Sequence, residues 1–448
     1  MKNVALYNLG CKVNSYETDG MRQMLEEKGY RIVPFDGPAD VYIVNTCTVT
    51  NIADRKSRQM LHRARQMNPD AVVVAVGCYV QTGREAVEKD ESIDLAVGNN
   101  RKKDIAEILE TYLAERQDKT LQGRTIPDIG STHEYEEMQL RQTSEHTRAY
   151  IKIQDGCNQF CSYCAIPYAR GRVRSRRMED VLREVRGMAE AGYREVVLTG
   201  IHLSSYGIDF KGDDCYNGSS YLMDLTEKLH EVQGLERIRL GSLEPRIITW
   251  ETAERMAAMP KLCPHFHLSL QSGCDDTLKR MNRHYTAGEY YDSVNILRSC
   301  FSEPAITTDV IVGFPGETEE EFRQTREFLE KVCFYEMHVF KYSRRAGTAA
   351  AAMPGQVPEQ VKATRSRELL ELTARQSAQF RSRYIGREAE VLLEEKREID
   401  GRIYLCGHTK DYVKAAVDIT ETATSDLPPV NTVVNIPVKK FLTDEIMV

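Results

Sequence analysis

The segment from Gln154 to Cys164 reads QDGCNQFCSYC and contains three cysteines, separated by three and then two residues. It directly follows a β-rich apolar run, Ala149–Ile153, that predicts a strand. Three thiolates at this spacing can hold three irons of a cubane iron–sulfur cluster, whose usual site has four cysteines. The fourth iron then stays open to a small molecule, so the segment predicts a reactive metal site. The three cysteines are Cys157, Cys161 and Cys164.

A zinc site is the alternative for these cysteines, because zinc also binds thiolates. Structural zinc needs four closed ligands, and no further Cys or His follows within the next several residues. His202 could complete the set only by folding back toward the cysteines. The ligand count therefore favours an open iron–sulfur cluster.

Strand and helix patterns alternate from Arg148 onward, and six such repeats predict a partial (β/α)6 barrel over residues 148–376. In such barrels the chemistry lies at the carboxyl ends of the strands, which is where the three cysteines are. The expected strands are Ala149–Ile153, Glu195–Leu198, Arg237–Leu240, Phe266–Leu270, Thr307–Val312 and Glu336–Phe340.

Residues 1–115 also alternate strand and helix patterns and predict a separate domain, an open parallel α/β sheet with helices on its faces. Three of its apolar runs are each followed at once by a cysteine, at Cys11, Cys47 and Cys78. Because the carboxyl ends of strands converge at one edge of such a sheet, these cysteines should meet in space. Each could instead be a small buried residue, but the neighbouring Gly, Asn and Thr are typical of ligand-binding turns.

Two further segments complete the expected α/β architecture. Residues 116–147 are polar without a sustained apolar period and predict a linker. Residues Pro358–Tyr384 predict a long polar helix. Beyond Gly386, short strands with Gly and Asn turns predict a small C-terminal β-barrel, so that residues 377–448 form a third module.

The composition is that of an ordinary soluble globular protein: 448 residues, 41% hydrophobic, 28% charged, with a formal net charge of −7. No apolar run approaches the ~20 residues that a membrane span needs, and the first residues lack the apolar core of a signal peptide. We therefore expect a cytoplasmic protein whose thiols stay reduced. Its 12 cysteines then indicate metal binding or catalysis rather than disulfides.

The pattern Cys157-x-x-x-Cys161-x-Tyr163-Cys164 resembles the signature of the radical S-adenosylmethionine enzymes. The resemblance implies that the open iron chelates S-adenosylmethionine, which is then cleaved to a 5′-deoxyadenosyl radical, chemistry that no side chain supplies. It implies cofactor contacts at successive strand ends. These are Tyr163 at the adenine, Gly200 at the methionine amino group, Glu244 at the ribose or carboxylate, and Gln271.

Two three-cysteine sites in this order resemble the methylthiotransferase family, and the resemblance covers essentially the whole chain. The family implies an N-terminal cluster domain, a radical S-adenosylmethionine barrel and a C-terminal TRAM domain. It also implies two 4Fe–4S clusters and S-adenosylmethionine as cofactors. The markers are Leu9-Gly10-Cys11-Lys12-Val13-Asn14, Asn45-Thr46-Cys47, Gly77-Cys78, the segment from Asp155 to Arg176, and His267–Gly273.

Within the family, Cys11-Lys12-Val13-Asn14 and the run from Pro167 to Arg176 most resemble the branch that acts on N6-threonylcarbamoyladenosine in tRNA. The resemblance implies that one S-adenosylmethionine supplies the methyl group, that a second supplies the radical, and that the methylthio group goes to C2 of adenosine 37. The implied partners are the tRNA anticodon stem-loop, an external electron donor and a sulfur donor, with no membrane, and we expect a monomer. The alternatives within the family are N6-isopentenyladenosine and a ribosomal-protein aspartate.

Five arginines lie between Arg170 and Arg177, beside the expected mouth of the barrel. Arginine pairs with phosphate bidentately, so we predict that Arg172, Arg174 and Arg176 bind RNA. Arg174 or Arg176 could instead meet the carboxylate of the threonyl group. In the C-terminal module, Gly407–Tyr412 is the expected RNA-contact loop, with scaffolding as the alternative.

A rival of another class is a non-catalytic iron–sulfur or zinc RNA-binding protein. The open three-cysteine site argues against it, because a structural site gains nothing from a vacant coordination position. Metal analysis separates the two, since the enzyme should carry about eight irons and the binding module one or two zincs.

Overall fold

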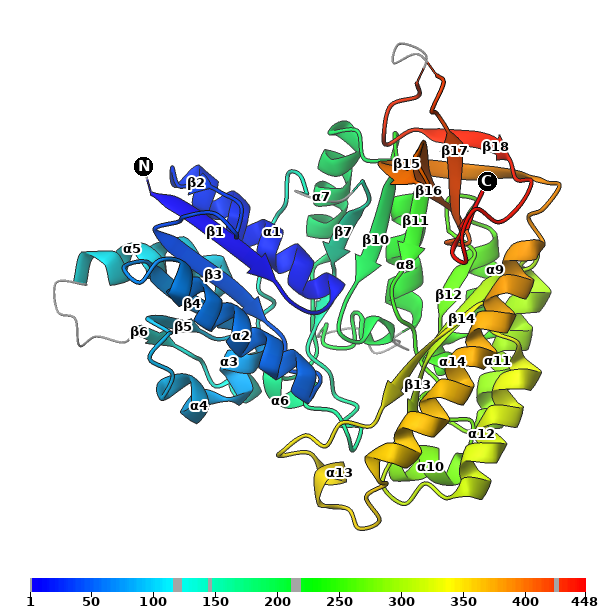
Figure 1. The fold of residues 1–448 in the computed structure, drawn as a ribbon, viewed down its shortest axis with the longest axis horizontal. Helices are drawn as coiled ribbons and strands as arrows, with labels where there is room; N and C mark the ends of the chain where they lie inside the picture. Colours follow the sequence, from blue (N-terminus) through cyan, green and yellow to red (C-terminus); the bar gives the residue numbers. More distant parts are fainter. Residues whose placement is uncertain (1, 116–122, 144–146, 211–218, 423–426) are drawn as a thin grey trace.

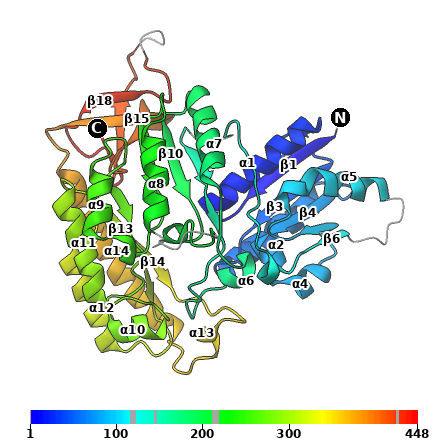
Figure 2. The same ribbon diagram turned by 180° about the vertical axis from the view of Figure 1, so that it is seen from behind.

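The computed structural model describes residues 2–115, 123–143, 147–210, 219–422 and 427–448 (Figure 1). Within these ranges, no helix combines the length and the apolar character needed to cross a membrane. The chain forms an N-terminal α/β domain, a central domain of strands and helices, and a C-terminal β module (Figures 1 and 2).

The N-terminal domain is a parallel sheet of six strands in the order β2-β1-β3-β4-β5-β6. Strand β4 reads VVVAVG and is buried along its whole length, as expected for a parallel strand covered on both faces. Helices α1 and α5 pack on one face, and α2 and α3 pack on the other. The bounds are β1 Asn3–Asn8, α1 Lys12–Glu27, β2 Arg31–Ile32, β3 Val41–Thr46, α2 Asn51–Met67, β4 Val72–Gly77, α3 Cys78–Thr82, α4 Arg84–Glu88, β5 Leu95–Val97, α5 Ile105–Glu115 and β6 Gly123–Thr125.

The strand order of this sheet reverses between β1 and β3, because the chain first runs outward to β2 and then crosses to β3, β4 and β5. In open α/β sheets, ligands bind in the crevice at the carboxyl ends of the strands where the order reverses. Cys11 and Cys47 follow the two strands that flank the reversal, and Cys78 follows the next strand. The topology therefore brings these cysteines to the edge that the sequence predicts.

The central domain consists of two three-stranded parallel sheets, β7-β10-β11 and β12-β13-β14. Single bridges between Ile238 and Leu262 and between Leu243 and Leu268 join them. Within the described residues β7 and β14 are not paired, so the six strands form an open partial barrel. Its strands are β7 Ala149–Lys152, β10 Glu195–Thr199, β11 Arg237–Leu240, β12 His265–His267, β13 Ala305–Val312 and β14 Glu336–Lys341.

Helices cover the outside of this partial barrel, as Figure 2 shows for α8, α9, α11 and α12. Helices α7, α8, α9, α11 and α12 each bury apolar residues in the core of this domain, for example Val181, Val185 and Met188 of α7. The helices are α7 Met178–Glu190, α8 Ser219–His230, α9 Trp250–Ala257, α10 Asp275–Arg280, α11 Ala287–Cys300, α12 Glu319–Val332, α13 Ala349–Ala352 and α14 Glu359–Ser382.

The segment 116–147, predicted as a linker, is built into both domains where the structure describes it. Strand β6 pairs with β5 at the edge of the N-terminal sheet. Met138 and Leu140 are buried in the core of the central domain. Met138 and Leu140 alternate with polar residues, and two apolar residues were too few for the sequence to predict a buried segment there. Residues 116–122 and 144–146 of the predicted linker lie outside the described part of the chain.

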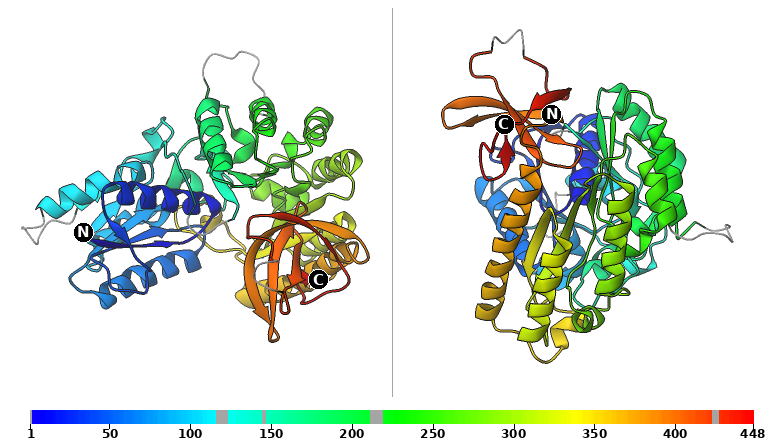
Figure 3. Two further views of the ribbon diagram at one scale, coloured as in Figure 1. Left: turned by 90° about the horizontal axis from the view of Figure 1, so that it is seen from above. Right: turned by 90° about the vertical axis from the view of Figure 1, so that its right-hand side faces the viewer.

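The C-terminal module is a five-stranded sheet in the order β18-β15-β16-β17-β19. Strand β15 has a bulge between Leu393 and Glu395, and the sheet curls strongly (Figure 3). No pairing of β18 with β19 closes it within the described residues, so the expected barrel is an open curled sheet. Its strands are β15 Glu388–Ile399, β16 Arg402–Thr409, β17 Lys414–Asp418, β18 Val433–Pro437 and β19 Ile446–Met447.

Helix α14 joins the central domain to this module without a break (Figure 3). Leu369 and Leu372 pack into the core of the central domain, whereas Phe380, near the end of the same helix, packs into the core of the C-terminal module. The helix therefore runs across the boundary expected after residue 376.

Candidate functional site

The three N-terminal cysteines lie close together although they are far apart in sequence. A side chain added at Gly10 would meet the Sγ atom of Cys47 at 3.0 Å, which places the Cys11 turn against Cys47. Burial, together with smaller contributions from the nearby Cys78 and Cys11, raises the pKa of the Cys47 thiol to about 11. The Asn99 amide donates to the Sγ atom of Cys78 at 3.5 Å. The convergence predicted from the strand ends is therefore present in the fold.

The second triplet lies on the loop that follows β8 Gln154–Asp155. Burial raises the pKa of Cys157 to about 11 and that of Cys164 to about 12, and in both cases neighbouring thiols of the triplet add to the shift. The Arg283 guanidinium donates to the Sγ atom of Cys161 at 3.3 Å. Metal binding at Cys157 and Cys164 therefore has to displace their protons.

Gly156 determines the path of the loop into this triplet. Its φ is +71°, and an added Cβ would lie 1.8 Å from the carbonyl oxygen of Arg172. Only glycine fits this close approach of two backbone segments. The loop before Cys157 is thereby pressed against the loop that carries the arginine run.

The spacing of the thiols distinguishes a cluster from a single metal ion. In the described part of the chain, the one group of three His, Cys, Asp or Glu ligand atoms that all lie within 4.8 Å of one another is His267, Asp309 and His338. Neither cysteine triplet is that tight, whereas zinc with bonds of about 2.3 Å would draw its sulfurs to within roughly 4 Å of one another. The wider spacing of both triplets therefore argues against a single zinc ion in either of them.

A buried network of ion pairs lies between the two triplets. Glu17 of α1 accepts from the Lys152 ammonium at 2.7 Å and from the Arg170 guanidinium at 2.8 Å, and it also pairs with Lys102. Asp155, two residues before Cys157, pairs with Lys152 at 2.7 Å and with Arg170 at 3.1 Å. The network thus ties the helix that begins after Cys11 to the loop that carries Cys157.

Both carboxylates of this network are held in the charged form. Burial alone would raise the pKa of Glu17, but Arg170, Lys102 and Lys152 outweigh it and hold that pKa well below its usual range. The pKa of Asp155 is lowered in the same way, because Lys152 and Arg170 outweigh its burial. The network is therefore a set of true ion pairs and not of neutral hydrogen bonds.

Of the arginines predicted to bind RNA, two lie inside the protein. Arg174 and Arg176 are at most 1% exposed. Arg176 pairs with Glu137 and Glu184, and the nearest carboxylate to Arg174 is Asp155, at 3.6 Å. Phosphate cannot reach these guanidinium groups in this arrangement. The prediction that Arg174 and Arg176 bind RNA is therefore wrong, and both side chains form ion pairs inside the protein instead.

Arg172 differs from its neighbours because its side chain is exposed. Its guanidinium lies over the ring of Phe160, 4.6 Å from the ring centre. It is therefore the member of the predicted RNA-binding set that solvent and a polyanion can reach.

Three predicted cofactor residues follow the strand ends around the second triplet. Gly200 comes directly after β10, and an added Cβ would lie 2.9 Å from the Oε1 atom of Gln154. Glu244 follows β11 and is buried, and its negative charge contributes to the raised pKa of the Cys157 thiol. Gln271 has a φ of +74°, and its backbone N–H donates to the carbonyl of Asp309 at 2.9 Å.

Tyr163, the fourth predicted cofactor residue, lies beside a cavity of about 240 Å³ that both domains line. The N-terminal domain contributes Val49 and Thr50, which follow Cys47 closely in sequence, and the central domain contributes Gln271 and Phe340 as well as Tyr163. Its remaining lining residues are Asp309, Ile311, Lys341, Tyr342 and Ser343.

Two apolar side chains at this cavity are unusually exposed. Val49 is 55% exposed and Phe340 is 47% exposed. An exposed aromatic ring such as that of Phe340 provides a stacking surface for a base. The sequence analysis predicted a site at neither residue. Phe340 lies near the carboxyl end of β14, which is where the chemistry of a barrel is expected, so its position could have indicated a role.

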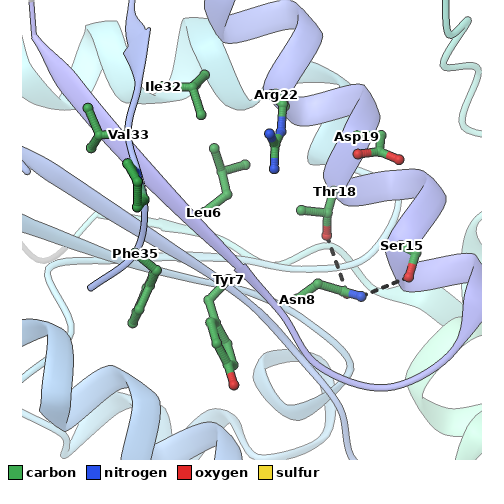
Figure 4. A pocket seen from close by; sticks show the side chains of 11 residues that line it. Leu6, Tyr7, Asn8, Ser15, Thr18, Asp19, Arg22, Ile32, Val33 and Phe35 are labelled. Carbon is green, nitrogen blue, oxygen red and sulfur yellow. Dashed lines mark hydrogen bonds between the residues drawn. The ribbon is translucent and has the colours of Figure 1, made fainter. Parts of the chain in front are cut away.

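A second hollow, of about 650 Å³, lies on the N-terminal domain between β1, β2 and α1 (Figure 4). Asn8 donates to the Ser15 hydroxyl there at 2.8 Å, while Arg22 and Phe35 line other parts of it. Only the N-terminal domain lines this hollow, whereas the shared cavity is lined by Val49 and Thr50, close to Cys47, and by Tyr163, between Cys161 and Cys164. The cavity shared by both domains is therefore the better candidate for the reacting group.

Two family models match the chain. The model of the radical SAM superfamily matches residues 151–329, which contain the second triplet. The model described as "Uncharacterized protein family UPF0004" matches residues 3–98, which contain the first. Together they cover more than half of the chain.

The chain is similar along most of its length to two kinds of curated relative. It is 41% identical to the threonylcarbamoyladenosine tRNA methylthiotransferase MtaB of Bacillus subtilis, over 94% of this chain and 91% of that protein. It is 35% identical to the tRNA-2-methylthio-N(6)-dimethylallyladenosine synthase of Carboxydothermus hydrogenoformans, over 91% of each.

Among solved structures, the chain is similar to the radical S-adenosylmethionine methyltransferase TsrM from Kitasatospora setae. The TM-score is 0.56 at 16% identity, covering 78% of this chain and 74% of that one. At this identity the likeness concerns the fold alone.

The two triplets predict a simple result in metal analysis. Cys47→Ala and Cys161→Ala should each lower the iron content of the anaerobically reconstituted protein by about half, since each removes a ligand from one of two clusters. Cys300→Ala, on the outer helix α11, should retain all of the iron. Full iron in either triplet variant, or stoichiometric zinc in the wild-type protein, would contradict the assignment.

Proposed function

This chain belongs to the radical S-adenosylmethionine tRNA methylthiotransferases, and we propose that it adds a methylthio group to C2 of N6-threonylcarbamoyladenosine 37. The observation that supports this most is the cavity shared by the two domains. Residues next to Cys47 form one wall, and Tyr163, between Cys161 and Cys164, forms another. A base in this cavity would lie between the two triplets.

We assign one 4Fe–4S cluster to Cys157, Cys161 and Cys164 and a second to the N-terminal triplet. When bound, the first supplies the electron that cleaves S-adenosylmethionine to a radical, and the second carries the sulfur that is transferred. The chain itself holds the thiols in two preformed groups and brings the substrate to both. An external electron donor and a sulfur donor complete the proposed reaction.

S-adenosylmethionine would lie against the strand ends beside the second triplet. The absence of a side chain at Gly200 lets the cofactor approach the backbone there. Glu244 is a buried carboxylate near Cys157 and can accept from an ammonium or a hydroxyl group. Tyr163 and Gln271 line the adjoining cavity and would contact the adenosyl group or the substrate.

The choice of substrate follows the more similar curated relatives. Proteins named for threonylcarbamoyladenosine reach 41% identity, whereas those named for dimethylallyladenosine reach 37%. A threonyl group also brings a carboxylate, which favours polar or cationic surroundings. The cavity lining includes Lys341, Gln271 and Ser343, which can donate hydrogen bonds to such a group, beside apolar residues such as Val49 and Phe340.

The two triplets should separate the two half-reactions. With Cys47→Ala, the reduced enzyme should still form 5′-deoxyadenosine from S-adenosylmethionine but no methylthiolated tRNA, because only the sulfur-carrying site is lost. With Cys161→Ala, both products should vanish. Chromatography of the nucleoside products checks this, and 5′-deoxyadenosine formed by Cys161→Ala would refute the assignment of the radical site.

A competition assay tests the substrate. The reconstituted enzyme receives equal amounts of two tRNAs, one with threonylcarbamoyladenosine and one with isopentenyladenosine at position 37. We expect methylthiolation of the first to exceed that of the second by at least tenfold, a difference of about 1.4 kcal/mol in transition-state binding. Preference for the isopentenyl tRNA, or for a ribosomal protein added as a third substrate, would overturn this choice.

A further inference from the structure

Arg345 follows β14 in the central domain, but its side chain reaches into the N-terminal domain. It is 8% exposed. Its Nη1 atom donates to Asn51 at 2.7 Å and to Asp54 at 2.6 Å, and its Nη2 atom donates to the Thr48 hydroxyl at 2.6 Å. One guanidinium of the central domain thus binds both the loop after Cys47 and the first turn of α2.

Two residues that this guanidinium binds flank, in sequence, the segment of the N-terminal domain that lines the cavity. Thr48 and Asn51 enclose Val49 and Thr50 in sequence, and these two are the residues that the N-terminal domain contributes to the cavity. Ser343, two residues before the arginine, lines the cavity from the central domain. The contact therefore joins the two walls of the cavity.

A chain of hydrogen bonds continues from Arg345 to the Cys78 turn. The hydroxyl oxygens of Thr48 and Thr82 are 3.2 Å apart, and Thr82 donates to the carbonyl oxygen of Cys78 at 3.1 Å. Because the Thr48 hydroxyl accepts from the guanidinium, it can donate to Thr82, and all the bonds then run in one direction. Bonds arranged in this way strengthen one another.

Neighbouring backbone contacts support the same junction without charge. The Asn51 N–H donates to the Ser343 hydroxyl at 3.2 Å, and the Asn51 amide donates to the Arg344 carbonyl at 3.0 Å. Arg344 itself is exposed, and its Nε atom donates to Ala351 within the central domain. It is therefore a matched control for the arginine that follows it.

We propose that Arg345 is a positioning residue that sets the separation between the N-terminal triplet and the barrel triplet, an inference that rests on the proposed function. It acts through Thr48 and the Cys47 loop. Its planar fork reaches three acceptors at once, which a lysine ammonium on a single stem cannot reproduce. Transfer of a group between two sites depends on such placement, since a misplacement of about 1 Å can cost roughly 100-fold in rate.

The test compares Arg345→Gln with Arg344→Gln in the reconstituted enzyme. We expect both variants to keep full iron and wild-type formation of 5′-deoxyadenosine. In Arg345→Gln, the ratio of 5′-deoxyadenosine to methylthiolated tRNA should rise about tenfold or more. Without tRNA, the spin–spin interaction between the two reduced clusters, seen by electron paramagnetic resonance, should change in Arg345→Gln and stay unchanged in Arg344→Gln. Arg345→Lys should fall between the two.

Thr48→Val provides a second variant, which breaks the hydrogen-bond chain without changing any charge. It should also raise the ratio of 5′-deoxyadenosine to methylthiolated tRNA while keeping its iron. Thr48→Val therefore still tests the proposal if Arg345→Gln fails to fold. Wild-type coupling and an unchanged spin–spin interaction in Thr48→Val and in any folded Arg345 variant would overturn the proposal. Failure of the wild-type enzyme to modify threonylcarbamoyladenosine would instead refute the proposed substrate, and the spin–spin measurement would still test Arg345.

Discussion

The arrangement of the whole molecule depends on the buried ion pairs between Glu17, Arg170 and Asp155. Glu17 belongs to the helix that begins after Cys11, and Asp155 belongs to the strand that leads into Cys157. Arg170 bonds to both at 2.8 and 3.1 Å. Removing one member of such a group leaves an uncompensated buried charge, at a cost of about 3–5 kcal/mol. The ion pairs of Glu17 with Lys152 and Arg170 therefore cross from one domain to the other and hold the two cysteine triplets in one geometry.

The same network has more positive than negative charge. The cations Lys102, Lys152, Arg170 and Arg174 face the carboxylates of Glu17 and Asp155, with the buried Glu136 near Lys152 and Lys102. The charge of Arg170 also reaches Cys11 and Cys47, where it favours the thiolate form. A surplus of buried cations beside thiolate ligands offsets the negative charge that a cluster brings. One set of residues thus serves both to join the domains and to prepare the N-terminal triplet for its cofactor.

Features that follow from regular local patterns, such as strands and the residues that follow them, could be predicted from the sequence. Cysteines placed directly after β-rich runs located Cys11, Cys47 and Cys78 at one sheet edge, and the topology brings them together there. The charge run was misread for Arg174 and Arg176, because a pattern of arginines does not reveal whether distant carboxylates cover them. Their partners Glu137 and Glu184 come from separate segments. The contact of Arg345 with the N-terminal domain was not predicted for the same reason, since its acceptors lie almost 300 residues earlier in the chain.

Mass spectrometry of tRNA nucleosides from cells with and without this chain tests the proposed function most directly. We predict that 2-methylthio-N6-threonylcarbamoyladenosine disappears without the chain, that its unmethylthiolated precursor accumulates, and that both return to normal when the chain is restored. Methylthiolated isopentenyladenosine should not change. If the threonylcarbamoyl nucleoside keeps its methylthio group while the isopentenyl nucleoside loses it, the substrate assignment is contradicted. If neither nucleoside changes, the proposed function itself is contradicted.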